Sequence, residues 1–105
     1  TKKVVKDPVI EAMAAAKYFP STPDRKIYGV ELDGPQYEDY ARTAGTLARL
    51  RMERLVKLPS FSRYPAEDQK TGMKRVFDKS REDARAIMLR KYKDLSRQAL
   101  ENKKH

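Results

Sequence analysis

Two long stretches of the chain repeat their apolar residues at intervals of three and four, and this period limits the fold more than any other feature. The first stretch follows a start signal at Asp33 and runs to about Leu58, and the second runs from Pro65 past Tyr92. Such spacing lines one side of an α-helix. Pro59 interrupts the period, so a short loop joins two antiparallel helices. The sequence predicts an all-α protein built on a long antiparallel helical hairpin.

The residues before the hairpin predict a short helix. Asp7 followed by Pro8 has the form of a helix start, because Asp accepts from free amides and Pro needs no hydrogen bond at the first helical position. We expect this N-terminal helix to cover residues 8–17.

An extended, Pro-containing connector follows the short helix. Pro20 and Pro23 break the helical period, and each disfavours helix at the residue before it. Residues 25–32 (RKIYGVEL) carry apolar side chains and have two interpretations, a short strand or an extended segment laid against the helices. No second strand is evident for this segment to pair with. We therefore expect this segment to lie extended against the helices.

The chain of 105 residues is long enough for one domain. We expect a basic flexible arm over residues 1–6, a single helical domain over residues 7–95, and a basic tail over residues 96–105 that frays.

Composition argues against catalysis. The chain has no cysteine, and its single histidine is the last residue, His105, which excludes thiol chemistry and a histidine-based triad or metal site. Neighbouring acids lie on helices beside basic residues, as on solvated faces. No stretch approaches the roughly 18 apolar residues of a membrane span. We expect no enzyme, no metal, no cofactor and no membrane span.

Small residues at the middle of both long helices predict close helix packing. Gly45 has two interpretations: it permits close approach of another backbone, or it is a tolerated weak spot that costs about 1 kcal/mol relative to Ala. The predicted packing residues are Ala41, Ala44, Gly45, Ala48, Ser80 and Ala84.

Aromatic side chains predict an interface. Phe61 and Tyr64 lie in the interhelical loop, where we expect them to fold back over the end of the hairpin. Two long helices and one short helix cannot cover all the aromatic rings, so a second subunit or a larger protein should cover one face. The candidate interface residues are Tyr37, Tyr40, Phe61, Tyr64, Phe77 and Tyr92.

The net charge of +9 favours an anionic partner, although solvated helices also carry excess Lys and Arg. No helix-turn-helix, zinc-finger or aromatic RNA-binding pattern is present, which argues against sequence-specific readout. The candidate phosphate-contacting residues are Lys2, Lys3, Lys6, Arg42, Arg49, Arg51, Arg90, Lys91 and Arg97.

The order of several motifs resembles the C-terminal helical region of large virion-associated proteins of tailed bacteriophages and prophages, which are tape-measure-like, internal or ejection proteins. The motifs are the DPVI start at residue 7, the two connector prolines, RKIYGVEL over residues 25–32, QYEDYARTAG over residues 36–45 and DARA over residues 83–86. The resemblance covers residues 7–92 and departs from the family pattern over residues 61–72.

The resemblance implies a particle component whose helical end docks on the portal, the tail or copies of itself, in the virion and, during assembly, in the host cytoplasm. It supplies no catalytic residue. The first hypothesis is therefore a non-enzymatic virion structural or assembly protein that acts as an oligomer or part of a larger assembly. The alternative is a sequence-independent nucleic-acid-binding protein that makes non-specific DNA contact. A third hypothesis is a small adaptor or enzyme regulator that buries its tyrosine-rich face on a partner.

Overall fold

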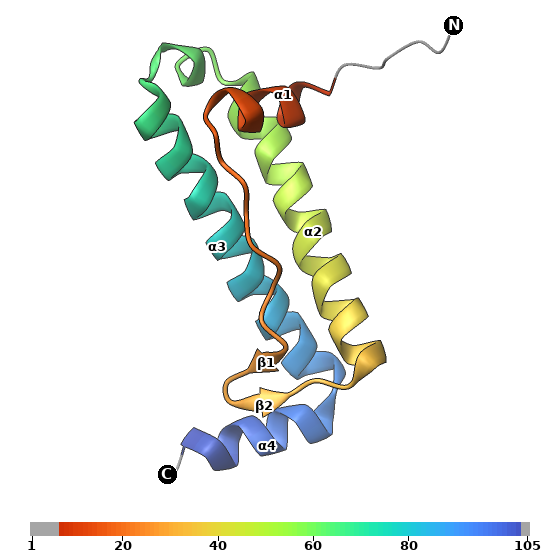
Figure 1. The fold of residues 1–105 in the computed structure, drawn as a ribbon. Helices are drawn as coiled ribbons and strands as arrows, with labels where there is room; N and C mark the ends of the chain where they lie inside the picture. Colours follow the sequence, from red (N-terminus) through yellow and green to blue (C-terminus); the bar gives the residue numbers. More distant parts are fainter. Residues whose placement is uncertain (1–6, 104–105) are drawn as a thin grey trace, which may run out of the picture.

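The structure, a computed structural model, describes residues 7–103, so the arm predicted over residues 1–6 lies outside the described residues. Helices α2 (Gly34–Lys57) and α3 (Ala66–Lys91) form the antiparallel hairpin, and the short helix α1 (Pro8–Ala15) lies across one end of it (Figure 1). The molecule is elongated, with dimensions of 48 × 35 × 19 Å. The all-α hairpin with a short N-terminal helix is confirmed.

Local signals fix the ends of α1 and α2. Asp33 accepts from the backbone N–H of Gln36 at 2.8 Å, and the Gln36 side chain accepts from the N–H of Asp33 at 3.1 Å. These reciprocal bonds start α2 as a capping box. Helix α1 starts at Asp7, whose carboxylate accepts from Val9 N–H at 3.0 Å. It ends earlier than predicted because Lys17 adopts a left-handed conformation with φ of 55°.

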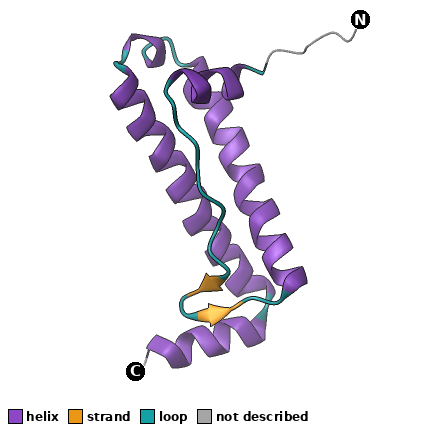
Figure 2. Cartoon of the chain, in the orientation of Figure 1, coloured by secondary structure: helices purple, strands orange, loops and turns teal. Residues whose placement is uncertain are grey.

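Residues 18–33, here named the strap, run along one face of the hairpin (Figure 2). The expectation that residues 25–32 contain no paired strand is wrong. Strands β1 (Lys26–Ile27) and β2 (Val30–Glu31) pair antiparallel, with Ile27 opposite Val30. Tyr28 and Gly29 both have positive φ, as a two-residue type I′ turn requires. The second strand was overlooked because it lies within the same eight residues and Tyr is not a typical turn residue.

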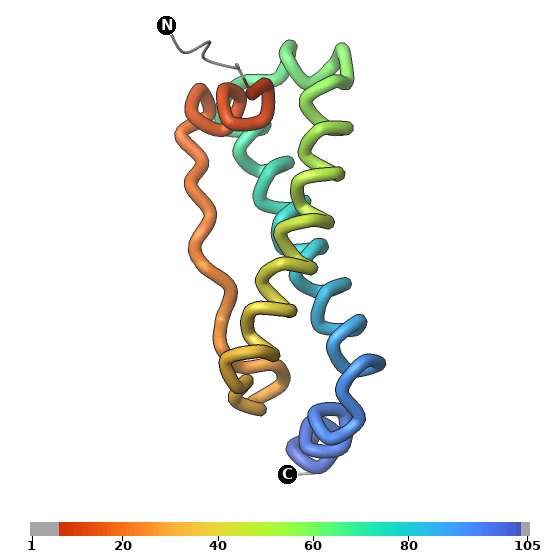
Figure 3. Tube along the Cα trace, turned by 90° about the vertical axis from the view of Figure 1, so that its right-hand side faces the viewer, coloured from red at the N-terminus to blue at the C-terminus, as the bar shows by residue number. Residues whose placement is uncertain are grey.

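The tail predicted to fray over residues 96–105 is helical up to residue 103. Helix α3 stops at Tyr92, where the backbone is extended, and α4 (Lys93–Lys103) turns away across the end of the hairpin (Figure 3). The change of direction brings Leu95 and Ala99 into the core, where both are buried. A straight continuation of α3 would carry these side chains past the end of the molecule.

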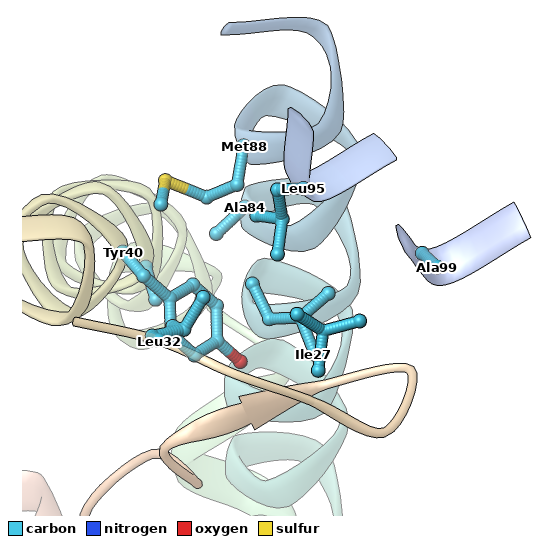
Figure 4. Packing of buried hydrophobic residues seen from close by; sticks show 9 residues of the cluster. Ile27, Leu32, Tyr40, Ala84, Met88, Leu95 and Ala99 are labelled. Carbon is cyan, nitrogen blue, oxygen red and sulfur yellow. The ribbon is translucent and has the colours of Figure 1, made fainter. Parts of the chain in front are cut away.

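The core consists of two clusters, one near each end of the hairpin. The strap, both long helices and α4 contribute to the cluster near α4 (Figure 4). Its buried residues are Ile27, Val30, Leu32, Tyr40, Ala44, Ala84, Met88, Leu95 and Ala99. The cluster at the other end joins α1, the interhelical loop and the long helices. Its buried residues are Val9, Ala16, Tyr18, Met52, Phe61 and Met73.

The predicted small-residue packing is correct in part. Ala44, Ala48, Ser80 and Ala84 are buried and Ala41 is half-buried. Gly45 is exposed, and a Cβ added there would meet no atom within 4 Å, so the interpretation of Gly45 as a close-approach site is wrong.

Candidate docking surface

The aromatic side chains predicted to form an exposed interface mostly lie inside the protein. Tyr40 and Phe61 are 1% and 5% exposed, and Tyr64, at 51%, is the only exposed member of the set. The remaining three, Tyr37, Phe77 and Tyr92, are half-buried. The prediction failed because it treated the connector and the tail as open chain, whereas the strap and α4 cover the hairpin.

The half-buried rings tie distant segments together. The hydroxyl of Tyr37 donates to the carbonyl oxygen of Pro23 in the strap at 2.8 Å. The hydroxyl of Tyr92 donates to the carboxylate of Asp39 at 2.8 Å. Phe77 packs against Tyr18, with ring centroids 5.6 Å apart. These contacts give the rings a structural role, so they offer little surface to a partner.

Ion pairs likewise occupy several residues predicted to contact phosphate. Arg51 bonds Asp83 at 2.6 Å, and Lys91 bonds Asp39 at 2.5 Å. The hydrogen bond from Arg51 lowers the pKa of Asp83, with a further contribution from Lys79. These two cations connect α2 to α3.

Arg49 bonds Asp7 at 2.7 Å and Glu53 at 2.9 Å, and thereby holds α1 against α2. The hydrogen bond from Arg49 also lowers the pKa of the Asp7 carboxyl. Arg97 makes a weaker, exposed contact with Asp94 at 3.4 Å. Arg42 and Arg90 are exposed and form no ion pair within residues 7–103, whereas Lys2, Lys3 and Lys6 lie outside the described residues.

A different surface emerges where the two long helices are connected. We name residues 54–75 the hairpin end; they comprise the last turn of α2, the short 3₁₀ helix η1 (Phe61–Arg63) and the start of α3 (Figure 1). Phe61 anchors the connection, because its side chain lies in the core and its carbonyl accepts from Gln69 Nε2 at 3.0 Å. The hydroxyl of Ser62 donates to the carbonyl of Pro59 at 3.2 Å. The connection is therefore held by its own contacts.

Two large apolar side chains of the hairpin end face solvent. Leu58 and Tyr64 flank the 3₁₀ helix and are each 51% exposed. Leu58 precedes Pro59, which holds its backbone extended and ends α2. Phe61 enters the core and Tyr64 does not, so the expectation that Tyr64 also folds back over the hairpin is wrong.

The hairpin end is also strongly basic. It contains six basic and two acidic side chains, a net charge of +4. Lys74 bonds Asp78 and Arg49 bonds Glu53, so these acids are engaged by cations other than Arg75 and Lys57. Five exposed cations of this surface form no ion pair within the described residues: Arg54, Lys57, Arg63, Lys70 and Arg75.

A shallow groove of about 410 Å³ separates α1 from the hairpin end. Ala12 and Ala15 line one wall and Val56 and Phe61 line the other, with Lys57 at its edge. The hairpin end thus combines a projecting connection, exposed apolar side chains, unpaired cations and an apolar groove. The sequence did not identify Leu58 as a functional candidate. It also did not identify Arg63, Lys70 and Arg75, because only the pairing of nearby acids with other residues distinguishes these cations from solvated ones.

Other kinds of site find no support within residues 7–103. No group of three or more His, Cys, Asp or Glu side chains is placed to hold a metal ion in this part of the chain. None of the described helices combines the length and the apolar character needed to cross a bilayer. The chain matches no protein-family model, and neither curated proteins nor solved structures gave a match.

Proposed function

We propose that this chain is a non-enzymatic structural or assembly component of a bacteriophage particle that works through protein–protein contacts at the hairpin end. The observation that carries the proposal is the exposure of Leu58 and Tyr64 on a connection that Phe61 already anchors. Exposed apolar side chains that lie close together and are rimmed by polar residues are typical of protein contact sites.

The ordered motifs over residues 7–92 support the particle component, and the shape of the molecule supports a mechanical role. The molecule is 48 Å long, the strap runs along one face of its hairpin, and the hairpin end lies opposite α4 (Figure 3). Such a body suits contacts with a portal, a tail or another copy of the chain, in the virion and in the host cytoplasm during assembly.

Nucleic-acid binding is the weaker candidate because ion pairs occupy four of the predicted phosphate contacts, Arg49, Arg51, Lys91 and Arg97. A protein that neutralises several phosphates loses DNA affinity steeply with salt, with a log-log slope of about −0.9 per contact. Weak, salt-sensitive DNA binding would fit a basic surface; tight binding by the full chain would favour the alternative.

The test measures incorporation into particles produced by a strain that encodes the chain. We expect tagged wild-type chain to co-sediment with particles or assembly intermediates, and Leu58→Ser to reduce the number of copies at least fivefold, on the order of one interface anchor. Leu100→Ser is the matched control, because Leu100 is 58% exposed but lies on α4. A wild-type chain absent from particles and intermediates would overturn the proposal.

A further inference from the structure

We infer that the hairpin end binds an acidic protein surface that offers an apolar pocket to Leu58 and Tyr64. The inference rests on the proposed function, because it names the chemistry of the partner for the same surface. Three properties of the hairpin end support it: its positive charge, its exposed apolar side chains, and a connection that is ordered before a partner binds.

The charge of the hairpin end calls for an anionic partner. Its net charge of +4 includes five exposed cations without an ion pair in the part of the chain that the structure describes. Arg54 lies on α2, Arg63 on η1 and Arg75 on α3, so an approaching acidic surface meets positive charge from the connection and from both long helices. Complementary charge of this kind speeds association and selects partners.

The apolar side chains favour a protein over a nucleic acid. Leu58 and Tyr64 each expose half of their surface, and a phosphate backbone makes no use of a Leu side chain. Tyr and Arg, here Tyr64 and Arg63, are among the residue types enriched at the centre of protein interfaces.

The connection is ordered before a partner arrives. Phe61 is 5% exposed and packs in the cluster with Met52 and Met73. The backbone N–H of Tyr64 donates to the carbonyl of Phe61 at 3.2 Å, which fixes the backbone of Tyr64 relative to this anchor. Binding therefore orders few backbone torsions, which lowers the entropy lost on association.

The experiment measures binding of the full chain to two labelled helical peptides of equal length, about 18 residues, and equal negative charge. One peptide carries Leu on one face, and the other carries Ser at those positions. Fluorescence anisotropy at about 50 mM and about 300 mM NaCl compares them with a duplex DNA of about 24 base pairs. We expect the Leu peptide to bind at least tenfold more tightly than the Ser peptide and more tightly than the DNA.

Charge-reversal variants locate the binding. Arg63→Glu should weaken binding of the Leu peptide at least tenfold, whereas Arg90→Glu, which reverses an exposed and unpaired cation on α3 near α4, should change it less than about twofold. Circular dichroism checks that both variants keep the wild-type helix content.

Equal affinity for the two peptides, equal effects of the two charge reversals, or tighter binding of the DNA would each overturn the inference. The proposed function is tested separately, by incorporation of the chain into particles. Wild-type incorporation that Leu58→Ser abolishes, together with equal binding of both peptides, would reject an acidic surface that offers an apolar pocket and leave the docking role intact.

Discussion

At the α4 end of the molecule, the carboxylate of Asp39 accepts from both Lys91 and Tyr92, and the ring of Tyr40 is 1% exposed. At the hairpin end, Tyr64 exposes half of its surface, and Arg63 beside it has no ion pair within residues 7–103. The same residue types, Tyr and basic side chains, therefore hold the fold at one end and face solvent at the other.

The position of the covering segments explains the difference. At the α4 end, the β-hairpin of the strap and α4 pack against the long helices (Figure 4). At the hairpin end, α1 and Tyr18 of the strap pack with Phe61 against the long helices, and Leu58 and Tyr64 lie outside this cluster. A side chain is buried when segments distant in sequence cover it, so Leu58 and Tyr64, which lie outside both core clusters, remain available to a partner.

The largest expected effect comes from removing the anchor of α4. Leu95→Ala should lower the free energy of unfolding by about 2–5 kcal/mol, because Leu95 is 2% exposed and its loss leaves a cavity between α4 and the strap. Denaturant unfolding measures the loss. Leu100→Ala, on the exposed side of the same helix, is the control and should change stability by less than about 0.5 kcal/mol. Equal effects would show that α4 does not close this end.

The next effect on stability differs between two glycines, Gly45 and Gly29. Gly45→Ala should raise the free energy of unfolding by about 1 kcal/mol, because the added Cβ meets open space and Ala favours helix. Gly29→Ala should destabilise the protein, since Gly29 has φ of +81° and an added Cβ would lie 3.2 Å from Nδ2 of Asn102 on α4. Thermal unfolding of the two variants compares an open position with a crowded one. A loss of stability in Gly45→Ala would revive the close-approach interpretation.

Local signals in the sequence were enough to predict the hairpin and the helix starts. The capping box of Asp33 and Gln36 and the Asp7–Pro8 start involve residues at most three apart, and the structure forms both. The break at Tyr92 is different, because a continuous helix satisfies the same local preferences. Only the burial of Leu95 against Ile27 and Leu32, more than 60 positions earlier in the chain, favours turning the helix.

The candidate site was predicted less well for the same reason. Arg51 and Arg54 lie one turn apart on α2, and the sequence treats them alike. Arg51 bonds Asp83, which is 32 residues away, and so becomes structural, whereas Arg54 finds no such acid within the described residues. Phe61 and Tyr64 are both large aromatic residues of the same short connection. The geometry of one 3₁₀ turn decides which of them enters the core.

A smaller effect on the stability of the protein depends on pH and involves Asp39. Hydrogen bonds from Lys91 and then Tyr92 lower the pKa of Asp39 in the folded protein below its ordinary value of 3.8. The unfolded chain therefore binds the proton first as the pH falls, and the stability that this carboxylate contributes is present above about pH 5 and is lost at lower pH.

Asp39→Asn should consequently be less stable than wild type at pH 7 and should lose less stability between about pH 5 and pH 3. Urea unfolding at several pH values gives both curves. Asp94→Asn removes an exposed carboxylate from α4 and serves as the control. Parallel curves for Asp39→Asn and wild type would mean that Asp39 does not hold α2 to the end of α3.

The smallest effect on stability is expected at the hairpin end, where Tyr64 faces solvent. Tyr64→Ser should change the free energy of unfolding by less than about 0.5 kcal/mol, because the ring is half exposed and belongs to neither core cluster. Thermal and denaturant unfolding measure this directly. A loss above about 1 kcal/mol would assign the ring to the fold, like Tyr40 at the α4 end. An unchanged stability together with lost docking would instead show that this end keeps Tyr64 in solvent for a partner.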